Sequence, residues 1–184
     1  MNVSRNQWIG IGIVAAVLLG FAFVSCGNAS AAPLYVKAEV GTTADTQVDT
    51  GFGSIEFTDG PVIGAYAGTA VGPVRVEAGI AHLSGDVNFF GLVVDGSAND
   101  YNATAYLDTS SGFYVGAGVD YIQAEASIGP WSVEQSGYGY HVSGGYAFAA
   151  AGGIVEVQAT YLEASLDDVD LSGPRFTVGY RHAL

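Results

Sequence analysis

This chain of 184 amino acids has few cysteines and few basic side chains. Cys26 is its single cysteine, so no disulfide framework within one chain can support the fold. Five Lys and Arg residues stand against 18 Asp and Glu, and the formal net charge of −13 argues against nucleic acid as a partner. Charged residues of both signs make up only 12% of the chain, fewer than a water-soluble surface needs.

The N-terminal region has the pattern of an export signal. A single basic residue, Arg5, precedes an apolar run from Trp8 to Val24, and Ala29-Ser30-Ala31 fits the small-x-small cleavage pattern. We therefore expect residues 1–31 to be a signal peptide and residues 32–184 to form one domain.

Two alternatives concern the same region. The apolar run approaches the length that spans a bilayer, so an uncleaved membrane helix is one of them. The other rests on Phe23-Val24-Ser25, which precedes Cys26 and resembles the lipobox of bacterial lipoproteins. In that case the cysteine would carry an acyl group.

The remainder of the chain is rich in apolar and small residues, and it alternates. Hydrophobic residues make up 49% of the sequence, with 27 Gly and 11 Tyr, which suits a wall that faces lipid. A period of two predicts strands, because successive side chains point to opposite faces. The alternating segments are Leu34–Val40, Pro61–Val71, Val74 to about Leu83, Tyr101–Asp108, Phe113–Ala126, Tyr140–Phe148, Val155–Tyr161 and Arg175–Arg181.

The connections between these eight segments alternate in length. Tight turns are expected at Gly72-Pro73, Thr109–Gly112 and Ala151–Gly153. Long polar connections are expected at 41–60, about 84–100, about 128–137 and 167–174. This order predicts an antiparallel meander with its tight turns at one end and its loops at the other. The fold class is therefore all-β, an eight-stranded antiparallel up-and-down transmembrane β-barrel.

Charges decide which face of the wall is inside. Basic and acidic residues lie opposite the apolar series of the strands, where they would form a charge network within the lumen. The network residues are Lys37, Glu39, Arg75, Glu77, Asp108, Asp120, Glu156, Arg175 and Arg181. A soluble barrel with the apolar face as its core is the alternative. Aromatic residues near strand ends of the apolar face, and glycines on the charged face, favour the membrane barrel.

Three stretches carry a resemblance to a known group of proteins. They are Val74–Gly79, Phe113–Asp120 and the last ten residues, Arg175–Leu184. They resemble the small eight-stranded outer-membrane barrels of the opacity-protein and OmpA/OmpX-like group. The resemblance implies the outer membrane of a Gram-negative bacterium, contact with its lipid and lipopolysaccharide, and insertion by the barrel-assembly machinery. It specifies an architecture and no activity.

Candidate chemistry is sparse. His82-Leu83-Ser84 resembles the His-x-Ser element of outer-membrane lipid A deacylases, but Gly85 follows it and the element lies in mid-chain. Asp167, Asp168 and Asp170 match no calcium-loop spacing, so we expect a solvated acidic loop. We expect no catalytic residues, no cofactor and no metal.

The expected function is structural or surface-interacting, exerted by a monomer through acidic extracellular loops. An adhesin that binds host or neighbouring cell surfaces is an alternative, with Phe89–Val94 and Trp131 as its contact surface. A small pore and a lipid A-modifying enzyme are two others. A pore is disfavoured, because an eight-stranded barrel is just wide enough for side chains to fill.

Overall fold

The structure is a computed structural model that describes residues 33–44, 46–50, 53–57, 60–89, 92–128, 131–167 and 169–184. The expected signal peptide, residues 1–31, and Cys26 therefore lie outside the described residues. No helix among the described residues is long and apolar enough to cross a membrane. The described part of the chain forms ten strands.

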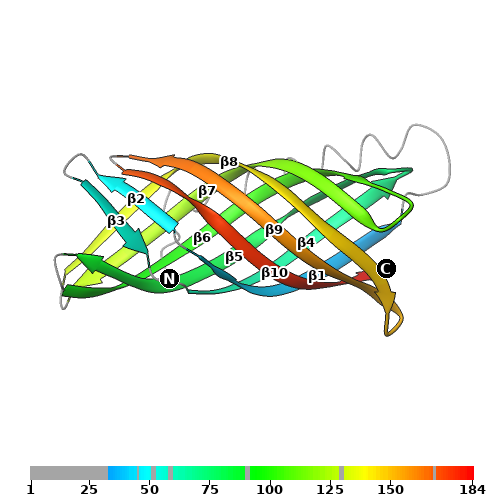
Figure 1. The fold of residues 1–184 in the computed structure, drawn as a ribbon, viewed down its shortest axis with the longest axis horizontal. Coiled ribbons are helices and arrows are strands. Elements are labelled where there is room, and N and C mark those ends of the chain that lie inside the picture. The colour runs from blue at the N-terminus through cyan, green and yellow to red at the C-terminus, as the bar shows by residue number, and fades with distance from the viewer. Residues whose placement is uncertain are drawn as a thin grey trace.

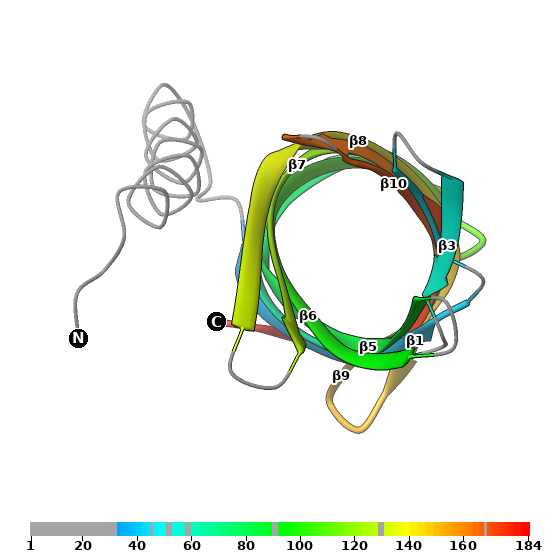
Figure 2. The same ribbon diagram turned by 90° about the vertical axis from the view of Figure 1, so that its left-hand side faces the viewer.

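Eight of these strands close into an antiparallel barrel (Figures 1 and 2). Each pairs with its neighbour in the chain, and β1 pairs with β10 to complete the wall. Lys37 lies opposite Arg181 at this closure. The eight are β1 (Leu34–Thr43), β4 (Pro61–Val71), β5 (Val74–Phe89), β6 (Leu92–Asp108), β7 (Phe113–Ile128), β8 (Trp131–Ala150), β9 (Gly153–Leu166) and β10 (Val169–Ala183). The predicted eight-stranded up-and-down barrel is confirmed.

The long connections are where the prediction was wrong, because they are largely strand. The expected 41–60 connection contains a hairpin of β2 (Thr46–Thr50) and β3 (Gly53–Phe57), which pairs with β10 on one side and β5 on the other. In the other three connections, adjacent strands run on until few residues separate them. Backbone pairing does not need apolar side chains, so the wall continues where the apolar alternation of its outer face has stopped.

The tight turns are as expected and lie together at the opposite end (Figure 1). Gly72 and Pro73 connect β4 to β5, and Gly72 has a φ of 60°. Ala151 and Gly152 connect β8 to β9 with φ values of 52° and 80°. Positive φ at both central residues is the geometry of the two-residue turn whose twist matches that of the strands.

The barrel wall changes character along its length. On the side of the tight turns, the outer face is apolar: Val115 is 62% exposed and Val157 50% exposed. We call this part the belt section. Its inner face carries buried polar and charged residues, the reverse of a soluble protein. Apolar side chains of this kind are stable on an outer face when that face meets lipid.

Toward the other end, the two faces exchange their character. On β7 the outward positions become Gln123 and Glu125, while the inward ones become Ile122 and Ala124. On β9, Glu163 points outward, and Leu162, Ala164 and Leu166 point inward and join the same apolar cluster as Ile122. We call this part the projecting section. Polar outside and apolar inside is the arrangement of a barrel wall in water, so this section extends beyond the lipid.

A row of tyrosines marks the level at which the faces exchange. Tyr101, Tyr121 and Tyr138 occupy facing positions on β6, β7 and β8. The ring of Tyr121 lies 6.3 Å from that of Tyr101 and 5.1 Å from that of Tyr138, measured between centroids. Outward-facing aromatic residues at the edge of an apolar band form the interfacial girdle of outer-membrane barrels. The row therefore marks the membrane boundary on β6, β7 and β8.

Candidate functional site in the barrel lumen

All nine predicted network residues occupy lumen-facing strand positions. Seven are buried: Lys37, Glu39, Arg75, Glu77, Asp120, Glu156 and Arg175. The side chains of Asp108 and Arg181 retain 31% and 11% of their exposure, because they lie nearer the tight-turn end. Alternation along the strands is the cause, since each charged residue is an even number of positions from the next on the same strand.

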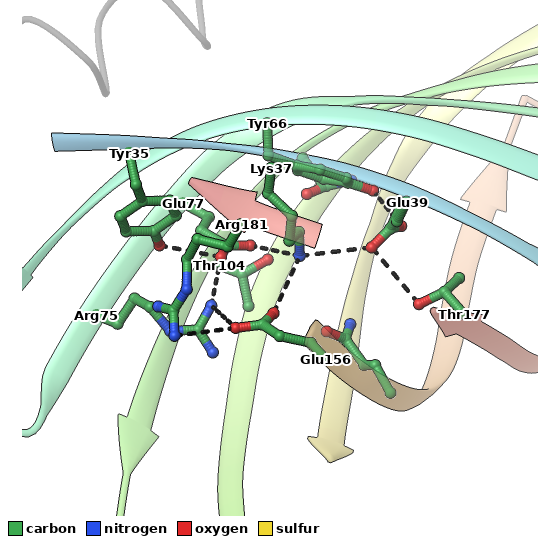
Figure 3. Close-up of polar contacts among 12 residues, drawn as sticks. Tyr35, Lys37, Glu39, Tyr66, Arg75, Glu77, Thr104, Glu156, Thr177 and Arg181 are labelled. Carbon is green, nitrogen blue, oxygen red and sulfur yellow. Dashed lines mark hydrogen bonds and ion pairs between the residues drawn. The ribbon is translucent and has the colours of Figure 1, made fainter. Parts of the chain in front are cut away.

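Lys37 lies at the centre of one cluster, and Figure 3 shows three carboxylates around its ammonium group. Its Nζ is 2.7 Å from Glu77 Oε2, 3.4 Å from Glu39 Oε2 and 3.9 Å from Glu156 Oε2. Glu39 lies on β1 with Lys37, whereas Glu77 and Glu156 come from β5 and β9, two strands away on either side. One ammonium group thus connects three strands of the wall.

Arg75 connects the same cluster to the tight-turn end. Its guanidinium donates to Glu77 Oε1 and lies 3.1 Å from Asp108 Oδ2 through Nε. It also approaches Glu156 Oε1 at 3.6 Å, and Arg181 Nη2 lies 3.2 Å from the same oxygen. Glu156 therefore lies between three basic groups, which offsets the cost of removing each charge from water.

Aromatic rings enclose the cluster. The phenol groups of Tyr35 and Tyr66 donate to Glu77 and Glu39, over 2.9 and 2.7 Å. The guanidinium carbon of Arg75 lies 4.0 Å from the centroid of the Tyr106 ring, a cation–π contact. The space for such a ring comes from glycine: a Cβ at Gly116, on the neighbouring strand, would overlap the ring of Tyr106.

A second cluster lies between the first one and the projecting section. Arg175 Nη1 is 3.0 Å from Asp100 Oδ2, and Asn102 donates to the same carboxylate. Across the lumen, His141 Nδ1 is 2.8 Å from Asp120 and its Nε2 is 2.9 Å from Thr104 Oγ1. Asp120 thus contacts a histidine and not one of the four basic residues.

Asp100 and His141 belong to this cluster but were not predicted from the sequence. Asp100 lies at the edge of a stretch that we expected to be a connection, so its place on a lumen-facing position was not considered. His141 lies on the charged face of its strand, but we gave it no role. Continuing the period of two backward from Asp108 would have placed Asp100 on the same face.

Asp120, His141 and Thr104 form an Asp–His–Thr series, which also occurs in hydrolytic sites. Asp120, His141 and Thr104 are each at most 3% exposed and are enclosed by the strands that carry them. A nucleophile must meet its substrate, and this hydroxyl has no open approach. The series therefore acts as a buried hydrogen-bonded support of the wall.

The sequence motif His82-x-Ser84 lies elsewhere, on the outer face. His82 is exposed and its Nδ1 lies 3.0 Å from Asn99 Oδ1.

The acidic stretch of Asp167 and Asp170 makes hydrogen bonds within the wall. Ser165 donates to Asp170 over 2.7 Å, and Asp167 accepts from the backbone N–H of Ser136. Within the described ranges, no group of three or more His, Cys, Asp or Glu residues could hold a metal ion.

The predicted adhesin surface is largely outside what the structure describes. Phe90 is not described, nor are the side chains of Phe89, Leu92, Val93 and Trp131. Val94 is described, and it is buried on the inner face. Asp168 of the acidic stretch also lies outside the described residues.

Comparisons with known proteins agree with the architecture. No family model matches the chain, and no curated protein matches it by sequence. Among solved structures, Neisserial surface protein A is similar, with a TM-score of 0.66 and 18% identity over 82% of this chain and 97% of that one. Ail, the attachment invasion locus protein of Yersinia pestis, gives a TM-score of 0.50 and 16% identity over 80% and 97%. With its closed wall of eight strands, this chain has the fold of the small outer-membrane β-barrels.

Proposed function

We propose that this outer-membrane barrel conducts no current and serves as a rigid support for an acidic surface outside the cell. The observation that carries the proposal is the charge network, in which ion pairs join opposite strands of the ring: Arg75 of β5 pairs with Glu156 of β9, and Arg175 of β10 pairs with Asp100 of β6. We expect a monomer, inserted by the barrel-assembly machinery, with outer-membrane lipid around the belt section.

The network blocks the lumen because its basic and acidic groups form ion pairs with one another. Each of the four basic residues, Lys37, Arg75, Arg175 and Arg181, has a carboxylate partner within 3.2 Å. These carboxylates are carried by three different strands, β5, β6 and β9. An ion entering the lumen would have to separate pairs that are screened little by solvent. The aromatic rings of Tyr66 and Tyr106 occupy space between the pairs.

The surface role rests on the distribution of charge. All four Lys and Arg among the described residues face the lumen. The outer face of the projecting section carries exposed acids instead: Asp86, Asp95, Glu125, Glu134, Glu163, Asp167 and Asp170. Glu125 and Glu134 lie directly opposite each other on β7 and β8, where like charges are destabilising. Such an arrangement favours a cationic partner, or lipopolysaccharide phosphates bridged through divalent cations.

Planar-bilayer recording tests the closed lumen. The purified barrel should give no reproducible steps of porin size, and neither should a Glu125→Gln variant, whose change lies outside the lumen. Steps of porin size from the unmodified barrel would replace this proposal with a pore function. Lipid A of unchanged mass in cells with and without the protein would exclude the modifying enzyme.

Binding of the barrel in nanodiscs to immobilised polylysine tests the acidic surface. Replacing Glu125, Glu134 and Glu163 with Gln should weaken this binding severalfold, because three exposed charges on one face are removed. Replacing the lumenal Glu156 with Gln is the matched control and should leave it unchanged. Equal effects of both changes would contradict a surface role.

A further inference from the structure

The projecting section encloses an apolar cavity of about 340 Å³. Its wall includes Leu83, Ala98, Ala124, Leu162, Leu166 and Leu171, which come from five strands and point inward. We call this cavity the chamber. It lies within the part of the barrel that extends beyond the tyrosine row, so lipid does not surround it.

Apart from Arg175, which belongs to both, the chamber is distinct from the charge network. In the belt section, polar and charged groups fill the lumen and pair with one another, whereas in the projecting section the lumen-facing residues of β9 become Leu162, Ala164 and Leu166. Apolar side chains on the inner face of an outward-polar wall are favoured when something other than water fills the space between them. A wall that supported exposed loops alone would need no such lining.

The lining also includes polar residues, and Arg175 is the one basic residue among them. Arg175 lines the chamber, is 6% exposed, and uses Nη1 to hold Asp100. Its Nε is buried and has no hydrogen-bond partner among the described residues. A buried donor without a partner is costly, so a ligand atom that accepts from Nε would be stabilised there.

Charge limits what that ligand can be. The one positive charge on the chamber wall is already paired with Asp100 at 3.0 Å, and the outer face of the projecting section is acidic. An anionic ligand would be repelled on approach and would compete with Asp100 for the same guanidinium. A cation would have to leave water for an apolar wall. An uncharged molecule meets neither cost.

The volume of the chamber limits the length of the ligand. An apolar protein cavity of about 150 Å³ holds benzene, with its six carbons, so a space of this volume holds roughly a dozen carbons. The lumen below is closed by the ion pairs, which leaves the end of the projecting section as the route of entry.

We propose that the chamber binds an uncharged, single-chain amphiphile of about twelve carbons, with a hydrogen-bond acceptor at Arg175 Nε and its chain among the inward-facing leucines. This site is separate from the surface role proposed above, and either can hold without the other.

Calorimetric titration of the barrel in nanodiscs with 1-alkanols of eight to sixteen carbons tests the proposal, with empty nanodiscs as the blank. Affinity should rise about fourfold with each added methylene, since each buried CH2 contributes about 0.8 kcal/mol, and should stop rising near twelve carbons. The carboxylate of equal length should bind at least tenfold more weakly. Binding equal to that of empty nanodiscs, or equal for alkanol and carboxylate, would overturn the proposal.

Two variants of one strand locate the binding. Ala124→Trp fills the chamber and should reduce dodecanol affinity more than tenfold, whereas Ala117→Trp places the same ring on the lipid face and should not. Equal affinities in the two variants would place the alkanol outside the chamber. Should Ala124→Trp fail to fold, NMR contacts between the alkanol chain and the Leu162 or Leu171 methyl groups decide the matter in the unmodified barrel, and their absence contradicts the proposal.

Discussion

Arg75 is fully buried in the lumen, yet it is surrounded by groups that favour its charge. Glu77, Asp108 and Glu156 supply negative charge, and the face of the Tyr106 ring lies 4.0 Å away. A charge in this position is stable because its partners are built into neighbouring strands. Removing one member leaves the others buried and unmatched, which costs more than the pair contributes.

Arg75→Ala should therefore lower the free energy of unfolding by about 3–5 kcal/mol, the cost of leaving buried carboxylates without a partner. The measurement is the urea midpoint of the barrel in detergent micelles.

The matched control is Glu125→Ala, which removes one exposed charge from the projecting section and should change stability by at most about 1 kcal/mol. If the two midpoints shift by the same amount, the lumenal ion pairs do not support the fold.

At the scale of the strand, β7 carries two different patterns on one continuous ladder. Its outward residues are Val115 and Val119 on one side of Tyr121, and Gln123 and Glu125 on the other. Both halves keep the same register with β8. A strand can thus pass from lipid to water without a bulge, because only the identity of its side chains changes.

Val119→Arg should destabilise the barrel in lipid by about 2–4 kcal/mol, since the charge enters the apolar belt. Gln123→Arg makes a similar change four residues further along the same face and should be nearly neutral. Urea unfolding from lipid vesicles compares them, and a neutral Val119→Arg would mean that the belt does not face lipid.

The turn between β8 and β9 offers a test free of packing effects. Gly152 has a φ of 80°, and a Cβ added there meets no atom within 4 Å. Gly152→Ala should lower stability by about 1–2 kcal/mol through backbone strain alone. Ala151→Gly, at a φ of 52°, should have the opposite sign. Detergent unfolding curves measure both, and shifts of equal sign would contradict the turn geometry.

How far the sequence predicted these elements depends on the same change of pattern. In the belt section, apolar and charged residues alternate, so the strands and the inward face of Lys37 and Arg75 could be read directly. In the projecting section the contrast between the two faces is weak. The strand prediction still reached Ala126 on β7, but residues of about 84–100, which belong to β5 and β6, were predicted as a connection. Asp100 was missed for that reason. Which residues meet across the lumen depends on how the barrel closes, and a local sequence pattern does not specify that closure.

For the whole molecule, the tyrosine row divides a membrane part from a part in water. Tyr101, Tyr121 and Tyr138 lie side by side on three neighbouring strands of the wall, β6, β7 and β8. The projecting strands then hold the acidic surface away from the bilayer on a continuous sheet, so its charges keep fixed spacings.

Spin labels at outward positions of β7 should report this division. Labels at Val115 and Val119 should be relaxed by oxygen dissolved in the bilayer, whereas labels at Gln123 and Glu125 should be relaxed by a water-soluble nickel complex. The crossover should fall at Tyr121. If a label at position 125 were relaxed by oxygen in the same way as a label at position 115, the projecting section would lie within the membrane.

The closure of β1 on β10 also brings the two ends of the barrel together: the backbone N–H of Leu184 donates to the carbonyl of Leu34 over 2.9 Å. The wall is thus a ring, and strand order in space does not depend on which strand is made first. A circular permutant could join these ends by a short linker and begin anew between Gly72 and Pro73, on the same rim. The folded permutant should migrate differently on a gel before and after boiling, and by the same amount as the original barrel. Failure to do so would mean that the order of synthesis, and not the ring alone, guides assembly.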